Sequence, residues 1–133
     1  MRAYLWLLLL ICSLISLGCG KEKTTAELIG DLKSQQGKEK LTAARLLPEH
    51  EGDAAQAIPA LIEALKDKDS HVRRSAAIGL GQLGAEAKEA IPALQSLQRD
   101  HDARIREAAS TALFRIDPTK FAAPTKTKPA KGK

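Results

Sequence analysis

The sequence predicts an all-α protein, a short α-solenoid of about three antiparallel helix pairs. The middle of the chain repeats itself at an offset of 33 residues, because AIPALIEALKDKDSHVRRSAAIGLGQLG from Ala57 aligns with AIPALQSLQRDHDARIREAASTALFRID from Ala90. Each copy holds two runs with apolar residues at helical spacing, separated by a polar turn. A period of this length is typical of helical repeats that stack on a shared core.

The first helix of the central unit is predicted to start near Ile58. Pro59 then falls in the first turn, where its missing N–H removes no helical hydrogen bond. The buried stripe of this helix is predicted to be Ile58, Leu61, Ile62 and Leu65.

The second helix of the central unit follows the polar stretch 67–70. Asp69 or Ser70 is predicted to cap its N-terminus, and Gly84 is well placed just beyond its C-terminus. Its buried stripe is predicted to be Val72, Ala76, Leu80 and Leu83.

The repeats are predicted to span residues 25–117. A weaker copy upstream of the central unit carries apolar residues at the same offset, namely Leu28, Leu32, Ala43, Ala44 and Leu47. In the last unit, Gln95 and Gln98 replace Ile62 and Leu65. This change predicts a polar outer face at the C-terminal end of the stack, as a terminal repeat requires.

The motifs of these units resemble the short HEAT repeats found in bilin-lyase-like proteins. The resemblance is carried by AIPALIEAL, by Asp-x-x-x-Arg at Asp69 and Arg73 with Val72 between them, and by SAAIGLGQLG; Asp102 and Arg106 repeat the pair in the last unit. In that family the aspartate and arginine typically form a ladder between neighbouring repeats. The resemblance therefore implies a structural role for Asp69, Arg73, Asp102 and Arg106.

The N-terminal segment 1–18 has the features of a secretory signal: a positive start, a short apolar run and small residues before Cys19. Ile15-Ser16-Leu17-Gly18-Cys19 resembles the lipobox of bacterial lipoproteins, which implies lipidation of Cys19 as the mature N-terminus, followed by a linker to residue 24. The alternative is an uncleaved signal anchor with an incidental cysteine. We expect an exported protein held by lipid in the bacterial cell membrane or outer membrane, facing the periplasm or the cell surface.

Charge is divided unevenly along the chain. Residues 24–117 carry 13 Lys/Arg and 15 Asp/Glu, a balance of −2, whereas the segment 118–133 carries five lysines and no acid. The tail, PTKFAAPTKTKPAKGK from Pro118, is predicted to be disordered. It either contacts polyanions and anionic surfaces or only aids solubility.

Few residues of the expected mature chain suit nucleic acid or catalysis. Tyr4 and Trp6 lie in the signal segment, so the mature chain lacks the stacking residues typical of nucleic-acid binding. The three histidines occupy unequal repeat positions, and neither a nucleophile–base pair nor a phosphate-binding glycine loop is present. We expect no enzyme activity, no cofactor and no metal, and do not expect nucleic acid as a partner.

A candidate protein-binding face lies opposite the buried stripe of the second helices, which HEAT-like stacks usually present on their concave side. We expect a protein-interaction or scaffold module with an unidentified protein partner; the alternatives are a subunit of a bilin-lyase-like enzyme or a passive envelope component that binds polyanions through its tail. The face consists of Leu41, Arg45 and Glu49 in the first unit, Arg74, Ile78 and Gln82 in the second, and Glu107, Thr111 and Arg115 in the third.

Overall fold

The computed structural model describes residues 22–50 and 52–124. These residues form α-helices and two short 3-10 helices and contain no strand. In chain order the elements are α2 (Thr25–Leu32), α3 (Gly37–Leu46), η1 (Leu47–Glu49), α4 (Ala54–Ala64), α5 (Ser70–Leu83), η2 (Gly84–Ala90), α6 (Ile91–Leu97) and α7 (Ala103–Ile116).

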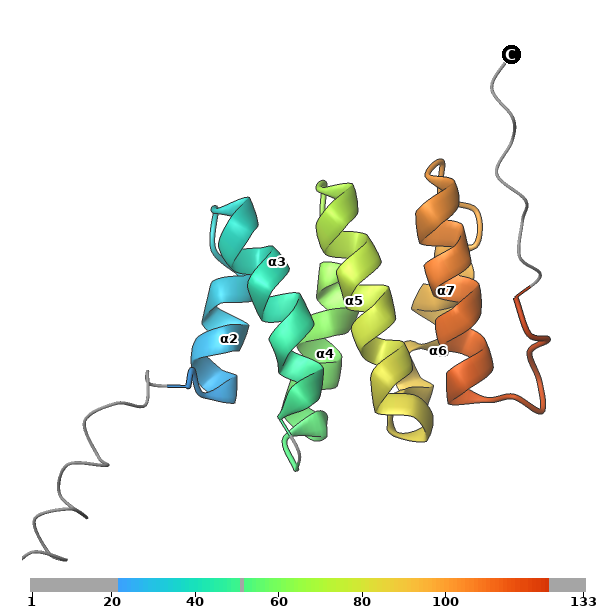
Figure 1. The fold of residues 1–133 in the computed structure, drawn as a ribbon, viewed down its shortest axis with the longest axis horizontal. Coiled ribbons are helices and arrows are strands. Elements are labelled where there is room, and N and C mark those ends of the chain that lie inside the picture. The colour runs from blue at the N-terminus through green and yellow to red at the C-terminus, as the bar shows by residue number, and fades with distance from the viewer. Residues whose placement is uncertain (1–21, 51, 125–133) are drawn as a thin grey trace, which may run out of the picture.

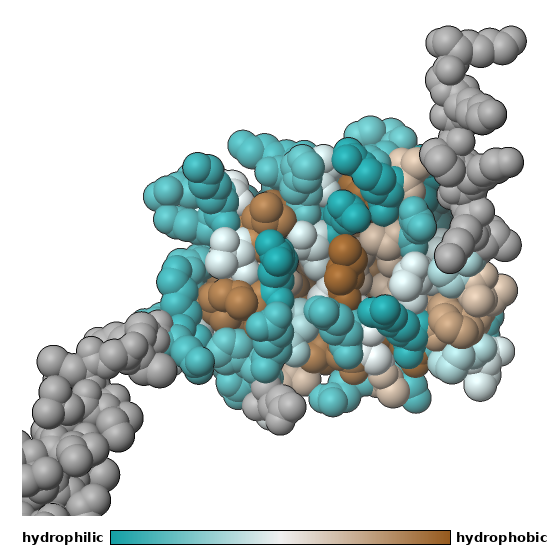
Figure 2. All heavy atoms as spheres, in the orientation of Figure 1, coloured by the Kyte–Doolittle hydropathy of each residue, from teal (hydrophilic) through white to brown (hydrophobic). Residues whose placement is uncertain are grey.

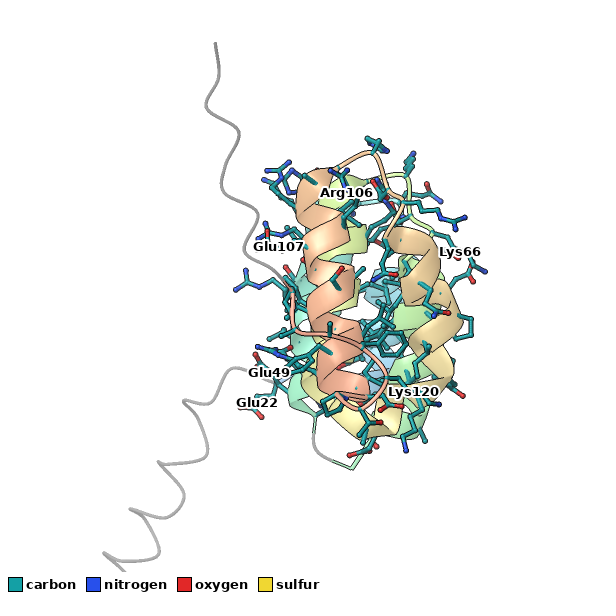
Figure 3. All side chains as sticks on the ribbon, turned by 90° about the vertical axis from the view of Figure 1, so that its right-hand side faces the viewer. Glu22, Glu49, Lys66, Arg106, Glu107 and Lys120 are labelled. Atoms are coloured by element: carbon teal, nitrogen blue, oxygen red, sulfur yellow. The ribbon has the colours of Figure 1, made fainter. Side chains whose placement is uncertain are left out.

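The helices form three consecutive pairs, α2–α3, α4–α5 and α6–α7, stacked in a row (Figure 1). The second helices α3, α5 and α7 lie side by side in one layer, and the first helices lie behind them. Figure 3 views the stack from its C-terminal end and shows the two layers edge on. The predicted short α-solenoid of about three antiparallel helix pairs is confirmed.

One core runs through all three pairs. Its fully buried side chains include Leu28, Leu47, Leu61, Leu80, Leu94 and Leu113. The predicted stripe of α5 lies in this core at Val72, Ala76 and Leu80, whereas Leu83 is half-buried. Each unit alone has too little apolar surface to enclose, so stacking of neighbours supplies the core.

Glycines let α5 approach both of its neighbours in the second-helix layer. A Cβ at Gly79 would lie 2.7 Å from Pro48 Cγ and 3.1 Å from the carbonyl oxygen of Ala44. On the other side, a Cβ at Gly81 would lie 3.0 Å from Ala112 Cα. These distances are shorter than ordinary van der Waals contacts, so each glycine marks a close helix–helix contact.

The predicted start of the central first helix is wrong by four residues. Helix α4 begins at Ala54, and Pro59 therefore lies inside it. The added turn buries Ala54 and Ala57 against the core, which offsets the hydrogen bond that Pro59 removes. In the last unit the corresponding turn is the 3-10 helix η2, and α6 starts at Ile91 with proline in its first turn.

The polar face predicted for the C-terminal end of the stack is exposed to solvent. Gln95 on α6 and Gln98 directly after it are exposed, whereas Leu65, which Gln98 replaces, is buried in the central unit. A polar outer face at this end leaves no large apolar surface in water.

The predicted disordered tail begins too early. Pro118 to Lys120 form a turn, in which the backbone N–H of Phe121 donates to the carbonyl oxygen of Asp117 at 3.2 Å. Phe121 is half-buried and packs against the core. Burial of this ring explains why the chain is ordered beyond Asp117, because the rest of the segment has little apolar surface. The rest of the predicted tail, from residue 125, the signal segment 1–18 and Cys19 lie outside the described residues.

Candidate interaction surface

The predicted ladder joins neighbouring units through Arg73, but its carboxylate is Asp100. Arg73 Nε donates to Asp100 Oδ2 at 3.1 Å, and its Nη1 donates to the carbonyl oxygens of Asp67 and Lys68 in its own unit. One unit earlier, Lys40 Nζ lies 2.6 Å from Asp67 Oδ2. The ladder therefore connects each second helix to the inter-helix turn of the next unit.

The ladder carboxylates are held in their ionised form. Burial raises the pKa of Asp100, but hydrogen bonds from the Asp102 backbone N–H and the Arg73 guanidinium outweigh it, so that the pKa lies below its ordinary value. At Asp67, burial is likewise outweighed by the Lys40 ammonium and the Asp69 backbone N–H, and the pKa is also lowered. These charges are paired, which is the condition for burying them.

The expectation that Asp69 and Asp102 belong to the ladder is wrong. Both are N-caps: Asp69 accepts the backbone N–H of His71 at 2.8 Å, and Asp102 accepts that of Arg104 at 2.9 Å. Each has extended backbone angles directly before its helix, which places the carboxylate over the free N–H groups of the first turn. The Arg104 side chain and this backbone bond lower the pKa of Asp102 to about 2.

Arg106 occupies the last rung of the ladder. Its Nη1 donates to the carbonyl oxygens of Asp100 and His101, as Arg73 does in its own unit. Within the described chain no later unit supplies a carboxylate to it. Figure 3 shows Arg106 near the N-terminal end of α7, close to the inter-helix turn that precedes this helix. Its contribution is therefore to hold the turn of its own unit.

The predicted binding row lies on the outer side of the second-helix layer. Figure 3 shows Glu49 and Glu107 on this side and Lys66 on the opposite layer. The exposed members of the row are Arg45, Glu49, Arg74, Ile78, Gln82, Glu107 and Arg115, while Leu41 and Thr111 are half-buried. The face is largely hydrophilic with separate hydrophobic spots (Figure 2).

Two grooves run along this face, one on each side of Ile78. The larger, of about 330 Å³, lies between α5 and α7 and is lined by Arg74, Ile78, Gly81, Arg104, Glu107, Ala108, Thr111, Ala112 and Arg115. The smaller, of about 200 Å³, lies between α3 and α5 and is lined by Arg45, Glu49, Ser75, Ile78 and Gln82. The structure thus brings together every predicted member of the row except Leu41.

Several residues that line the larger groove were not among the residues predicted for the row. Arg104, Ala108 and Gly81 fall outside the series of every fourth residue that defined the row, although they face the same space between α5 and α7. The small residues along both helices were the available signal, because they allow the close helix contact that forms the groove floor. A third hollow, between α2 and α4, lies on the opposite layer and includes Ile29, Lys33 and Ala60.

The described residues show no arrangement suited to metal binding. They contain no group of three or more histidine, cysteine, aspartate or glutamate side chains placed to hold a metal ion. His101 Nδ1 lies 3.2 Å from Asp100 Oδ1, but its side chain is 84% exposed in an inter-helix turn. That exposure favours a solvated surface contact over an enclosed reaction site.

Comparison with known protein families identifies the repeat. Residues 25–117 match the family of HEAT repeats, and this span covers most of the chain. The chain belongs to the HEAT-repeat family. Its HEAT repeats coincide with the helix pairs of the structure.

A solved structure gives a second comparison. The HEAT-repeat chain is similar to a chain of the complex of CpcE and CpcF of phycocyanin lyase from Nostoc sp. PCC7120, with a TM-score of 0.66 and 30% sequence identity. The match covers 75% of this chain and 40% of that one, so the present chain spans less than half the length of its structural relative. Among curated proteins, none matches the chain.

Among residues 22–50 and 52–124, no helix combines the length and the apolar character needed to cross a bilayer.

Proposed function

We propose that this HEAT-repeat protein is a non-enzymatic interaction or scaffold module, anchored in the bacterial cell envelope by lipid at Cys19. HEAT repeats expose a long row of side chains on stacked second helices, which suits contact with another protein. The anchor is supported by the lipobox-like sequence before Cys19.

The observation that carries the interaction role is the position of Ile78. Among large apolar side chains of the described residues it is the exposed one, at 40% of its surface, and it lies between the two grooves of the binding face. An exposed apolar residue with polar and charged neighbours has the composition of an interface centre with a polar rim. A protein surface seated there would remove Ile78 from water.

Affinity capture with paired variants tests this role. The full chain, with a C-terminal affinity tag, is expressed in its own host as wild type, Ile78→Asp or Gln56→Asp, and proteins retained from the envelope fraction are compared. Gln56 is an exposed residue of α4 in the opposite layer, so its change controls for added charge. We expect the same partner with wild type and Gln56→Asp, and its loss with Ile78→Asp. An identical set of retained proteins for all three would contradict the proposed face.

The anchor is tested separately with Cys19→Ser. A serine cannot form the thioether to the diacylglycerol, so the variant should accumulate unprocessed or leave the membrane fraction. Mass spectrometry of the N-terminal peptide and membrane partitioning measure the change. Cleavage after Gly18 and unchanged partitioning in this variant would contradict lipid anchoring.

A second candidate function is a subunit of a bilin-lyase-like enzyme, favoured by the similarity to the phycocyanin lyase complex. The match covers 40% of that relative, which was solved as a complex of two proteins, CpcE and CpcF. The discriminating measurement is chromophore attachment: the purified chain is mixed with a bilin and apo-phycocyanin, alone and with each phycocyanin lyase subunit. Covalent attachment that requires this chain would support the enzyme role and exclude a purely non-enzymatic one.

A further inference from the structure

The floor of the larger groove follows from the close contact of α5 and α7. Gly81 approaches Ala112 so closely that a Cβ would lie 3.1 Å from the alanine methyl carbon. Ala108 and Ala112 line the groove with only their methyl groups, and Ile78 adds the one large apolar side chain. The centre of the groove can therefore receive an apolar side chain, and its volume of about 330 Å³ is at the lower end of the range for ligand pockets.

The groove also carries an excess of positive charge. Three of its four charged side chains are arginines, Arg74, Arg104 and Arg115, against the single carboxylate of Glu107. Residues 24–117 as a whole carry more acids than bases, so this excess is local. The smaller groove has no such excess, because Arg45 is matched there by Glu49.

Two of the three arginines have no ion-pair partner in the described part of the chain. Arg104 pairs with Asp102 at 3.0 Å, whereas Arg74 and Arg115 form no ion pair among residues 22–50 and 52–124. A guanidinium binds carboxylate or phosphate through two parallel hydrogen bonds, so an arginine without an ion-pair partner beside a groove is suited to an acidic ligand.

We propose that the groove between α5 and α7 binds an acidic peptide segment of the protein partner. An apolar side chain of the segment packs on Ile78 and the alanine floor, and its carboxylates pair with Arg74 and Arg115. The proposal rests on the interaction function above and specifies the chemistry of the partner. The groove extends along α7 from Arg104 to Arg115, which are 11 residues (115 minus 104) or about 16 Å apart. The bound part of the segment would therefore be about five extended residues long.

An acidic peptide fits this groove better than a nucleic acid or another polyanion. Phe114 and Phe121, the aromatic residues of the described chain, do not line the groove, so bases have no stacking surface there. A phosphate polymer would pair with the arginines but would leave Ile78 without an apolar contact. The combination of an apolar centre with arginines on both helices is matched by alternating acidic and apolar side chains.

Selection from a random dodecapeptide display library on the full-length, detergent-solubilised chain tests the proposal. We expect enriched peptides with at least two Asp or Glu residues flanking an aliphatic or aromatic residue. A fluorescent peptide of the enriched sequence should bind the Arg74→Glu/Arg115→Glu variant about tenfold or more weakly. The matched control Lys88→Glu/Arg99→Glu makes the same charge change at exposed positions outside the groove, and should bind as wild type.

Two further measurements separate the groove from folding and from the lysine tail. A peptide with lysines in place of its acids should bind the Arg74→Glu/Arg115→Glu variant better than the wild type, which an unfolded variant could not show. Deletion of residues 125–133 should leave binding of the acidic peptide unchanged. Failure of this charge-reversed pairing, or loss of binding on deletion of 125–133, would overturn the groove assignment.

The remaining outcomes are equally decisive. No enrichment, enriched peptides without acids, or equal weakening by the control variant would overturn the proposal. Heparin held by Arg74 and Arg115 while acidic peptides are not would assign the groove to polyanions instead. If Ile78→Asp still abolishes capture of the native partner in any of these cases, the proposed interaction function stands and only the acidic-peptide assignment fails.

Discussion

Arg73 and Asp100 form an ion pair across the boundary between the second and third repeats, with Arg73 Nε 3.1 Å from Asp100 Oδ2. Both side chains are largely buried, with 10% and 8% of their surface exposed. Because Arg73 also donates to two carbonyl oxygens of its own inter-helix turn, a single guanidinium fixes one turn and attaches the next repeat to it. The register of the stack is thus set by a charged contact as well as by the apolar core.

Replacing Arg73 by methionine should strongly destabilise the stack. The change removes the charge from a buried pair and leaves the Asp100 carboxylate and two turn carbonyls without their donor, which typically costs about 3–5 kcal/mol. Arg104→Met is the matched control, because the Arg104 side chain is 62% exposed and water screens its pair with Asp102, so its loss should cost far less. Urea unfolding followed by circular dichroism compares the two. An equal loss of unfolding free energy in both variants would mean that burial does not make the Arg73–Asp100 pair more important for stability.

Acid should destabilise the protein through the same ladder. Asp67 and Asp100 have a lower pKa in the folded chain than their ordinary value of 3.8, so they bind protons more weakly when folded. Their stabilising contribution is fully present above that value and is lost as the pH falls through the folded pKa. We expect the thermal midpoint to drop steadily below about pH 4.

Two variants isolate the ladder's part in this pH dependence. Asp100→Asn should have a lower midpoint at pH 6 and a shallower further decline in acid than the wild type. Glu89→Gln changes an exposed carboxylate that forms no ion pair in the described residues, and should follow the wild-type curve. If the thermal midpoint of Asp100→Asn falls with decreasing pH as steeply as that of the wild type, other carboxylates cause the acid sensitivity.

The fold could be predicted because the repeat supplies the same pattern more than once. Leu80 and Leu113 occupy equivalent positions, and both are fully buried. The roles within the ladder could not be assigned in this way, because Asp67 and Asp69 both recur at the same offset, as Asp100 and Asp102. Only the backbone geometry before each helix distinguishes the capping carboxylate from the one that pairs with the preceding repeat.

The residues predicted for the row lie on one face because helical periodicity alone determines which residues lie opposite the buried stripe. The grooves depend in addition on the distance between helices, which periodicity does not contain. Gly81 and Ala112 determine that distance through their contact. The order at Phe121 was not predicted for a similar reason. The Phe121 ring packs against the edge of the core, and the composition of the segment does not show which residues reach that edge.

Gly81→Ala should destabilise the protein although alanine is the better helix former. The propensity gain is about 1 kcal/mol, but the new Cβ would lie 3.0 Å from Ala112 Cα, and separating the backbones of α5 and α7 should cost about 1–3 kcal/mol. Gly30→Ala is the control, because a Cβ there meets nothing within 4 Å. We expect Gly30→Ala to stabilise by up to about 1 kcal/mol and Gly81→Ala to lower the unfolding midpoint. Stabilisation by both changes would mean that α5 and α7 have room to separate.

The C-terminal residues should divide into a structural part and a charged part at about residue 124. Phe121 packs against the core, so Phe121→Ala should cost about 1 kcal/mol, a fraction of the value for a fully buried ring. Deletion of residues 125–133 removes Lys126, Lys128, Lys131 and Lys133 and should leave the unfolding midpoint unchanged.

Heparin binding provides the second readout of this division. The deletion of 125–133 should reduce retention on a heparin column, because clustered lysines attract polyanions without specific geometry. Residual attraction in the wild type should vanish at about 1 M salt, where the Debye length is about 3 Å. Phe121→Ala keeps every lysine and should elute as the wild type does, despite its lower stability. Unchanged heparin retention after the deletion would place the polyanion contact on the repeats, and a lowered unfolding midpoint would extend the structural part beyond residue 124.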